Sequence, residues 1–226
     1  MNLLILGRGK TGSLVADVAR ERGHDLAVLC SADNCRAEGL TPERLKDVAV
    51  VIDFTHPSAV VDNIHACSQT RTNMVVGTTG WYEHLGKVER VVNETGIGFL
   101  YSANFSVGVN LFFDAVEAAG AALRHRYSGQ IFERHHAKKK DAPSGTAIKM
   151  QQIVKKASGA EVEIVSFREG EVVGMHEVVL ESPNDRIYLC HDAKSRRGFA
   201  EGAVRAAEWL AGRKGFFDFK DVWRQL

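Results

Sequence analysis

The sequence has few cysteines, little excess of either charge and no long apolar run. Its four cysteines form no C-x-x-C pair and are too sparse for a disulfide scaffold in a chain of 226 residues. A formal net charge of +1 gives no overall attraction to nucleic acid or to an anionic membrane. No apolar stretch approaches the ~20 residues that a membrane span needs, and no basic, apolar leader opens the chain. These absences predict a cytoplasmic protein with neither a nucleic-acid nor a membrane partner.

Short apolar runs alternate with helical patterns over the first part of the chain. Each run is continuous rather than alternating, as in strands that are covered on both faces. The pattern therefore predicts an α/β fold with a Rossmann-type, doubly wound parallel sheet. The expected strands span 3–6, 26–30, 48–54, 74–76 and 97–101, and the expected helices span 12–22, 58–68 and 83–93. The stretch 33–47 is expected to be a loop.

The pattern changes after residue 101, which indicates a second unit. Helices are expected over 107–123 and 147–157. Strands are expected over 130–133, 161–167, 175–181 and 186–191, the last two joined by the turn-forming Ser182-Pro183-Asn184-Asp185. An alanine-rich helix over 199–210 closes the pattern, and the glycines at 212 and 215 end it.

A complete G-x-G-x-x-G motif, Gly7-Arg8-Gly9-Lys10-Thr11-Gly12, lies directly after the first expected strand and opens the first helix. Its glycines would let a pyrophosphate approach bare backbone N–H groups at the positive end of the helix dipole. Arg8 and Lys10 add positive charge beside it. In this context the motif predicts a dinucleotide site. The alternative is a glycine-rich turn that merely lets strand and helix pack.

The choice between NADH and NADPH is open at this point. A carboxylate that accepts from the ribose 2′-hydroxyl is expected near the tip of the second strand, where the sequence has Ser31. Asp33 follows two residues later and could still reach a hydroxyl, whereas Arg36 or Lys10 could attract a 2′-phosphate. We therefore expect the protein to use both cofactors.

Two further polar segments end expected parallel strands. They are Gly77-Thr78-Thr79-Gly80 and Ser102-Ala103-Asn104-Phe105. Since ligands bind at the carboxyl edge of such sheets, both segments are candidates for the cofactor site. The alternative for each is an ordinary turn between a strand and a helix.

The segment 133–147, ERHHAKKKDAPSGTA, combines two histidines, three adjacent lysines and a Pro-Ser-Gly turn. The lysines repel one another and Pro143 breaks regular structure, so pairing along a helix does not explain the segment. Gly145 and Thr146 at a helix start would present N–H and hydroxyl groups to a carboxylate. A histidine beside them can donate a proton near neutral pH. The segment predicts an anionic ligand, and the alternative is a solvated charged loop.

No metal-site or hydrolase signature accompanies this segment. Adjacent His135 and His136 point in different directions along a strand, so they do not converge as zinc ligands do, and we predict no metal. A G-x-S-x-G nucleophile motif is absent. The other histidines lack comparable surroundings, and we expect most of them to be surface or packing residues: His24, His56, His65, His84, His125, His176 and His191.

The segment 133–147 closely resembles the signature of the 4-hydroxy-tetrahydrodipicolinate reductase family, also called the dihydrodipicolinate reductase family. The resemblance extends over nearly the whole chain, through the G-x-G-x-x-G motif, VIDFTHP, VVGTTGW, SANFSVGVN, SFREG, SRRGFAEGAVRAAEWLAG and GFFDFKDV. Three features depart from the family pattern. They are a chain shorter than usual, GRGKTG where the family often has GRMG, and Ser31 in place of the strand-two acid.

The resemblance implies NAD(P)H-dependent reduction of 4-hydroxy-tetrahydrodipicolinate (dihydrodipicolinate) to tetrahydrodipicolinate in lysine and diaminopimelate biosynthesis. It implies that His135 is the catalytic proton donor and Lys139 a second cationic donor. A small dicarboxylate substrate is expected to bind His136, Ser144, Gly145 and Thr146. The expected binding residues for NADH or NADPH are Gly7, Arg8, Gly9, Lys10, Thr11, Gly12, Ser31, Gly77, Thr78, Thr79, Ser102, Ala103, Asn104 and Phe105.

The resemblance also implies an architecture. A dinucleotide-binding domain of residues 1–105 is completed by 199–226, and an α+β substrate-binding domain, 106–198, has an open mixed sheet that builds a homotetramer. Two other functions compete with this one. The first is another Rossmann reductase, such as an aspartate-type dehydrogenase. The second is a cofactor-sensing binding protein without turnover, against which the intact His135 and Lys139 argue.

Overall fold

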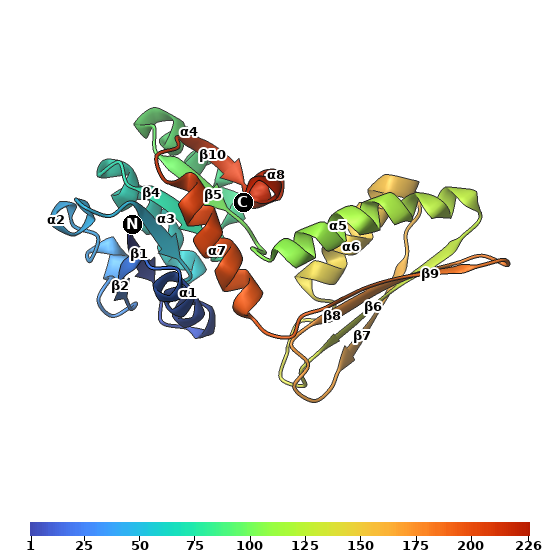
Figure 1. The fold of residues 1–226 in the computed structure, drawn as a ribbon. Helices are drawn as coiled ribbons and strands as arrows, with labels where there is room; N and C mark the ends of the chain where they lie inside the picture. The colour runs from blue at the N-terminus through green and yellow to red at the C-terminus, as the bar shows by residue number, and fades with distance from the viewer. The chain divides into compact units, whose positions relative to one another are not determined.

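The computed structural model describes residues 1–226, which divide into two compact units (Figure 1). Unit 1 comprises Met1–Val107 and Arg197–Leu226, and unit 2 comprises Gly108–Arg196. The divisions fall at 107/108 and 196/197, close to the domain boundaries expected at 105/106 and 198/199. The functions assigned to the two domains remain predictions.

Unit 1 contains a six-stranded parallel sheet with the strand order β10-β5-β4-β3-β1-β2. This order confirms the expected Rossmann-type sheet. It reverses at β1, which has β2 on one side and β3 on the other, and ligands bind at such a switch point. The strands are β1 (Asn2–Leu6), β2 (Asp25–Leu29), β3 (Val50–Asp53), β4 (Asn73–Val76), β5 (Gly98–Tyr101) and β10 (Gly215–Asp218). The longer helices are α1 (Lys10–Glu21), α3 (Pro57–Gln69), α4 (Leu85–Thr95) and α7 (Arg197–Leu210).

The strand side chains of unit 1 alternate between two apolar cores. Leu3 and Ile5 of β1 pack in one core with residues of α1 and α7. Leu4 and Leu6 of the same strand pack in the other core with residues of α3 and α4. Because helices cover both faces, the middle positions of the central strands are apolar on both sides, which explains their continuous apolar runs.

Several short elements of unit 1 have no counterpart in the expected pattern. The stretch 33–47, expected to be a loop, contains the 3-10 turn η1 (Cys35–Ala37) and the helix α2 (Pro42–Leu45). After α7 the chain continues through β10 into α8 (Phe219–Val222) and η4 (Trp223–Gln225), and η2 (Tyr82–His84) precedes α4. β10 has four residues and takes its hydrogen bonds from β5, which is distant in the sequence. No local pattern reveals a strand of that kind.

Unit 2 contains an open, mixed four-stranded sheet, as expected, with the strand order β7-β6-β8-β9. β7 runs parallel to β6, whereas β8 is antiparallel to both β6 and β9. The strands are β6 (Ser128–His135), β7 (Glu163–Arg168), β8 (Met175–Glu181) and β9 (Arg186–Asp192). The helices are α5 (Val107–Gly120), η3 (Ala121–His125) and α6 (Gly145–Ser158).

The two faces of the unit 2 sheet differ. α5 and α6 cover one face, where Val116, Met150 and Val154 pack against Ile131 and Val178 (Figure 1). No helix of the unit covers the other face, which is hollowed by a volume of about 580 Å³. That face, called the uncovered face below, is lined by Ser128, Gly129, Gln130, Phe132, Arg134, Glu163, Phe167, Glu177, Val179, Glu181, Arg186 and Tyr188.

The four cysteines are all free thiols, in keeping with the absence of a disulfide scaffold from the sequence. No helix combines the length and the apolar composition that a bilayer crossing requires.

Candidate functional site

The glycine loop between β1 and α1 fits a dinucleotide. Gly7 has a φ of +102°, and a Cβ at this position would lie 2.2 Å from the Phe54 carbonyl oxygen. A Cβ on Gly12 would lie 2.2 Å from the Gly7 carbonyl oxygen, whereas nothing lies within 4 Å of a Cβ built on Gly9. The loop is therefore packed tightly against the protein at Gly7 and Gly12 and is open at Gly9, as a pyrophosphate cradle must be.

The start of α1 is suited to an anion. The helix begins at Lys10, two residues before the expected start, and no side chain caps it at Gly9. Its first turn contains no acidic residue, so its backbone N–H groups and the positive end of the dipole are available. Arg8 and Lys10 are exposed beside it and add positive charge. These features fit the phosphates of NADH or NADPH.

A hollow of about 300 Å³ brings together half of the predicted cofactor residues, all of them in unit 1. Gly9 to Gly12 line it from the glycine loop, and Gly77, Thr78 and Thr79 line it from the end of β4. The segment after β3 also contributes Phe54, Thr55 and Pro57, which were not among the predicted residues. Their position directly after a buried central strand was the signal that could have identified them.

The Asp53 carboxylate lies beneath this hollow and organises its wall. Asp53 is fully buried, and its Oδ1 accepts from Thr55 Oγ1 at 2.7 Å, Thr55 N at 2.9 Å and Thr78 Oγ1 at 2.7 Å. Its Oδ2 accepts from Asn63 Nδ2 at 2.8 Å, and the Asn63 side chain accepts in turn from Asn34 Nδ2 at 2.9 Å. The network thus links the ends of β3 and β4 with the segment after β2.

The tip of β2 carries Ser31 and Asp33, both exposed. The Cys30 thiol donates to Asp33 Oδ2 at 2.9 Å. That hydrogen bond, with the nearby charges of Arg8 and Arg44, holds the pKa of the Asp33 carboxyl below its ordinary value. Asp33 is therefore an ionised group close enough to the glycine loop to sense Arg8.

The segment 102–105 after β5 does not line the hollow. The Ser102 hydroxyl is turned into its own loop, where it donates to the Asn104 carbonyl at 2.9 Å and accepts from Asn104 N at 3.0 Å. Phe105 is 2% exposed and packs its ring against Phe219 with centroids 4.8 Å apart. The Phe105 side chain is therefore not available to a ligand. The roles predicted for Ser102, Ala103, Asn104 and Phe105 remain predictions.

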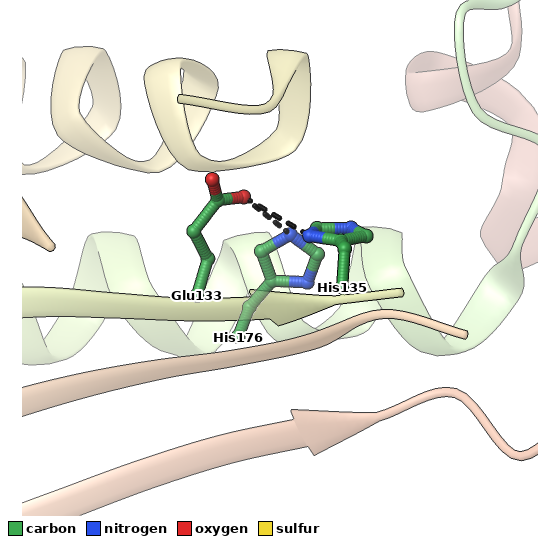
Figure 2. Close-up of side chains that lie close together, drawn as sticks. All are labelled: Glu133, His135 and His176. Carbon is green, nitrogen blue, oxygen red and sulfur yellow. Dashed lines mark ion pairs between the residues drawn. The ribbon is translucent and has the colours of Figure 1, made fainter. Parts of the chain in front are cut away.

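Unit 2 gathers a second cluster, formed by Glu133, His135 and His176 (Figure 2). Glu133 and His135 are two residues apart on β6, so their side chains emerge on the same face, and His176 lies opposite Glu133 across the β6–β8 pair. All three residues are buried. Glu133 Oε2 lies 3.3 Å from His135 Nδ1 and 3.9 Å from His176 Nε2.

The other oxygen of Glu133 is fully engaged. Oε1 accepts from Ser144 N at 3.0 Å, Ser166 Oγ at 2.7 Å and Arg168 Nη2 at 2.7 Å. Burial raises the pKa of Glu133, but hydrogen bonds from Ser144, Arg168 and Ser166 outweigh it and lower the pKa to about 2. Glu133 is thus a carboxylate at every pH at which the protein would work.

The two histidines are held in their neutral form. Burial, followed by the neighbouring His135, lowers the pKa of His176 to about 4 against the opposing effect of Glu133. Burial also lowers the pKa of His135, while Glu133 raises it and Lys139 and Arg168 lower it. A negatively charged ligand near His135 would favour its protonated form.

The basic loop after β6 supplies the remaining predicted residues. Both oxygens of Asp141 accept from Lys139 Nζ at 2.8 Å, so the lysine is ion-paired and would have to exchange this partner for a ligand. His136 Nε2 lies 3.5 Å from Arg196 Nη2, which brings a second cation to the loop. Arg196 was not a predicted site residue, although it lies in the family-like segment that ends the domain.

The start of α6 has the form of an anion site. Ser144 is the N-cap, and its hydroxyl accepts from Ala147 N at 3.2 Å and lies 3.2 Å from His176 Nε2. Gly145 is exposed, Thr146 is half-buried, and the first turn has no acidic residue. Because the Ser144 hydroxyl is buried and engaged within the protein, the groups that face a ligand belong to Gly145 and Thr146.

The expectation that His176 has no special surroundings was wrong. His176 lies in the buried cluster, in contact with the Ser144 that caps α6. Its strand offered the signal, because His176 shares the alternate positions of Val178 and Leu180, which face the core. Glu133 and Arg168 were also missed as site residues, although Glu133 has the same alternate spacing from Ile131.

Glu133, His135 and His176 are also the only group of side chains that could hold a metal ion, since one ligand atom from each lies within 4.8 Å of the others. However, Arg168 Nη2 already places a positive charge 2.7 Å from the same carboxylate. A dication at Oε2 would be repelled by this guanidinium. The absence of a bound metal therefore stays our prediction.

Family models match both parts of the chain. The model described as dihydrodipicolinate reductase, N-terminus, matches residues 1–105, and the one described as dihydrodipicolinate reductase, C-terminus, matches residues 108–223.

Individual proteins are similar over the same span. A 4-hydroxy-tetrahydrodipicolinate reductase of Christiangramia forsetii is 36% identical over 242 aligned positions, covering 100% of this chain and 99% of that protein. The enzyme of the same name from Laribacter hongkongensis is 39% identical over 194 positions, covering 76% of this chain and 72% of that protein. A solved structure of dipicolinate-bound dihydrodipicolinate reductase from a Paenisporosarcina species has a TM-score of 0.82 at 22% identity and covers 98% of this chain and 99% of that one. That structural likeness shows the fold.

Proposed function

Because the chain belongs to the dihydrodipicolinate reductase family, we propose specific roles for its residues in that family's reaction. The chain reduces 4-hydroxy-tetrahydrodipicolinate with NADH or NADPH, a step of lysine and diaminopimelate biosynthesis. The bound nicotinamide supplies the hydride. The protein must therefore hold the cofactor, bind a dicarboxylate and deliver a proton.

The cofactor is held by the hollow at the carboxyl edge of the unit 1 sheet. The N–H groups at the start of α1 bind the pyrophosphate, and Arg8 and Lys10 neutralise its charge. Thr78 and Thr79 contact the cofactor from the end of β4, in a geometry that Asp53 maintains. The open space at Gly9 supports this assignment most strongly.

His135 is the proton donor. Hydride addition to a conjugated imine adds electron density to the ring, so a nearby proton donor stabilises the transition state more than the ground state. His135 Nδ1 faces Glu133 Oε2, which leaves Nε2 to donate to the substrate. A Cβ on Gly174 would lie 3.0 Å from Nε2, and the glycine therefore keeps this side of the ring clear.

Lys139 is the second cationic donor, and it stabilises negative charge that develops on the substrate. The substrate carboxylate takes the place of Asp141 as its partner. The start of α6, with the backbone of Gly145 and the hydroxyl of Thr146, binds a carboxylate of the substrate, and His136 with Arg196 adds positive charge. This dianion raises the pKa of His135 and so favours the protonated donor.

The test of these roles is NAD(P)H oxidation with substrate freshly made from pyruvate and aspartate semialdehyde. We expect His135→Ala to lower kcat by about 10²–10⁴-fold, the usual contribution of a general acid. Lys138→Ala, a change at an exposed lysine of the same loop, serves as the control and should leave kcat unchanged. Wild-type kcat in the His135 variant would remove His135 from the reaction, and turnover of an aspartate-type imine instead would favour the other Rossmann reductase.

Both NADH and NADPH are proposed as cofactors. Ser31 can bond either a 2′-hydroxyl or a 2′-phosphate, and Arg8 lies near enough to Asp33 to compensate a phosphate there. We expect the two kcat/KM values to differ by less than about 10²-fold, or roughly 2.7 kcal/mol. Ser31→Glu should shift the ratio toward NADH because its charge repels a 2′-phosphate. A wild-type preference above this limit would contradict the proposal.

We also propose a homotetramer built on the uncovered face of the unit 2 sheet. Phe167 and Tyr188 are 39% and 62% exposed on this face. Arg134 and Glu177 on the same face offer charges of both signs, which suits contact with a second copy of the chain. Light scattering at micromolar concentration should give four times the chain mass of 24.8 kDa, and Tyr188→Glu should lower it. A monomeric wild type would contradict this assembly.

A further inference from the structure

One oxygen of Glu133 has no hydrogen-bond donor, which sets this residue apart from an ordinary buried carboxylate. The Glu133 side chain is 0% exposed, and Oε2 is buried without a partner of acceptable geometry. His135 Nδ1 and His176 Nε2 lie 3.3 and 3.9 Å from Oε2. A buried, charged oxygen without a donor is costly, so its retention needs a functional reason.

The two oxygens of Glu133 face the two parts of unit 2 that the proposed function uses. Oε1 accepts from the backbone N–H of Ser144, the N-cap of α6, and so fixes the start of the helix that binds the substrate carboxylate. Oε2 faces Nδ1 of His135, the proposed proton donor. A single carboxylate therefore contacts both the cap of the anion site and the ring of the donor.

We propose that Glu133 is a positioning residue that orients His135 through Oε2 and fixes the start of α6 through Oε1, so that the proton donor and the carboxylate site keep one geometry. The proposal rests on the roles given above to His135 and α6. Its first consequence is that neutral His135 carries its hydrogen on Nδ1, the ring nitrogen that lies 3.3 Å from Oε2. Its second is that imidazolium formed on substrate binding is stabilised by Oε2, while the proton on Nε2 passes to the substrate and His135 returns to its neutral form.

His176 packs between His135 and the N-cap of α6, and the proposal assigns it no contact with the substrate. Its ring packs edge-on against that of His135 with centroids 5.1 Å apart, and its Nε2 lies 3.2 Å from the Ser144 hydroxyl. It therefore fills the space between the donor and the cap of α6. Being neutral, it adds no positive charge that would oppose protonation of His135.

The direct test is an NMR titration of His135 in the full-length protein, with its ring nitrogens observed. The charged groups that face His135 are Glu133 on β6, Lys139 and Asp141 in the basic loop, and Arg168 on β7, with titratable His176 on β8. Glu133→Gln removes only the first of these. We expect it to lower the His135 pKa by about one unit or more and to move the hydrogen of the neutral ring from Nδ1 to Nε2.

Glu169→Gln is the matched control. Glu169 follows β7, and its backbone N–H donates to the His135 carbonyl, but its side chain is half exposed, pairs with Arg134 at the surface and is not among the charged groups that act on the His135 ring. It should leave the His135 pKa and tautomer as in the wild type. A His135 pKa that is the same in Glu133→Gln and in the wild type would overturn the proposal, as would an Nε2–H tautomer in the wild-type protein. The wild-type tautomer can be read even where the Glu133 variant fails to fold.

Kinetics separate this proposal from the role of His135 itself. In Glu133→Gln the loss of kcat at high pH should begin about one unit or more lower, and Glu133→Asp, which keeps the charge, should restore part of the shift. Because the Gln oxygen can still accept from Ser144 N, KM for the substrate should change by less than about 3-fold. If Glu133→Gln shifted the His135 pKa in the NMR titration but not the pH profile of kcat, Glu133 would be coupled to His135 and His135 would be refuted as the proton donor.

Discussion

Asp53 in unit 1 and Glu133 in unit 2 are both buried carboxylates, but their charges are compensated by different sets of donors. Both oxygens of Asp53 accept hydrogen bonds from neutral donors, Oδ1 from Thr55 and Thr78 and Oδ2 from Asn63. Glu133 has an Arg168 guanidinium and two serines on one oxygen, whereas the other has no hydrogen-bond donor and lies near histidine nitrogens. A carboxylate that accepts hydrogen bonds on both oxygens holds the loops around it in place. A carboxylate that has one oxygen without a donor, beside titratable histidine rings, can influence which ring nitrogen carries a proton.

The largest expected effect lies in the basic loop beside Glu133. Lys139→Ala should lower kcat by about 10²-fold or more with little change in cofactor binding, because the role proposed for the lysine is toward the substrate rather than the dinucleotide. Stopped-flow or steady-state NAD(P)H oxidation measures kcat, and fluorescence titration measures NADH binding. Lys140→Ala, an exposed neighbour, is the control. Unchanged kcat in the Lys139 variant would show that unit 2 supplies its positive charge from elsewhere.

His176, the titratable neighbour of Glu133, should make the free energy of unfolding depend on pH. The pKa of His176 falls from an ordinary value of 6.5 to about 4 on burial. As the pH drops below 6.5, the unfolded chain takes up a proton that the folded protein accepts only near pH 4. The contribution of His176 is therefore fully present above pH 6.5 and is lost toward pH 4, by about 3 kcal/mol in all.

Urea unfolding at pH 7 and pH 4.5 measures this contribution. His176→Gln should lose stability less steeply between these two pH values than the wild type does. The control is His84→Gln, which changes an exposed histidine in unit 1. An equally steep loss in the His176 variant would contradict burial of the neutral ring.

In contrast to Glu133, a substitution of Asp53 should change the stability of the protein and leave the pH dependence of kcat unchanged. Asp53→Asn replaces one acceptor oxygen by an NH₂ group that would face a donor, so we expect a loss of about 2 kcal/mol in the free energy of unfolding. Because Thr55 and Thr78 line the cofactor hollow, KM for NADH should rise as well. Denaturant unfolding measures the first effect. A stable variant with a shifted pH profile would invert the comparison between the two carboxylates.

The smallest effect is expected at the carboxylate site proposed at the start of α6. Thr146→Val should raise KM for the dicarboxylate by about 10-fold, or 1.4 kcal/mol, because it removes one hydrogen bond to a charged group. kcat should change little, since the contact is made in both the ground and the transition state. Thr146→Ser keeps the hydroxyl and should restore KM. Unchanged KM in the valine variant would place the carboxylate site away from α6.

The sequence allowed the scaffold to be predicted wherever local patterns decide the structure. The continuous apolar strands β1 and β3, the turn at 182–185 and the start of α6 are all found near their expected positions. β10 and α2 escaped because each is four residues long and depends on distant partners. The alignment with the Christiangramia forsetii relative covers 100% of this chain and 99% of that protein.

The site was less predictable than the scaffold. The glycine loop and the basic loop are continuous motifs, so their residues could be named from the sequence. His176 and Arg168 could not, because they join Glu133 only through the register of β8 and β7 against β6. Glu133 lay inside the quoted motif, yet its role depends on its burial and on which oxygen meets which donor, and no spacing rule contains that information.

The most direct test of the difference between the two carboxylates is the pH dependence of kcat for the wild type, Asp53→Asn and Glu133→Gln, measured side by side with saturating cofactor and substrate. The account predicts that the loss of activity at high pH begins about one unit or more lower in the Glu133 variant and is not shifted in the Asp53 variant. Identical profiles in all three proteins, or equal shifts in both variants, would contradict it.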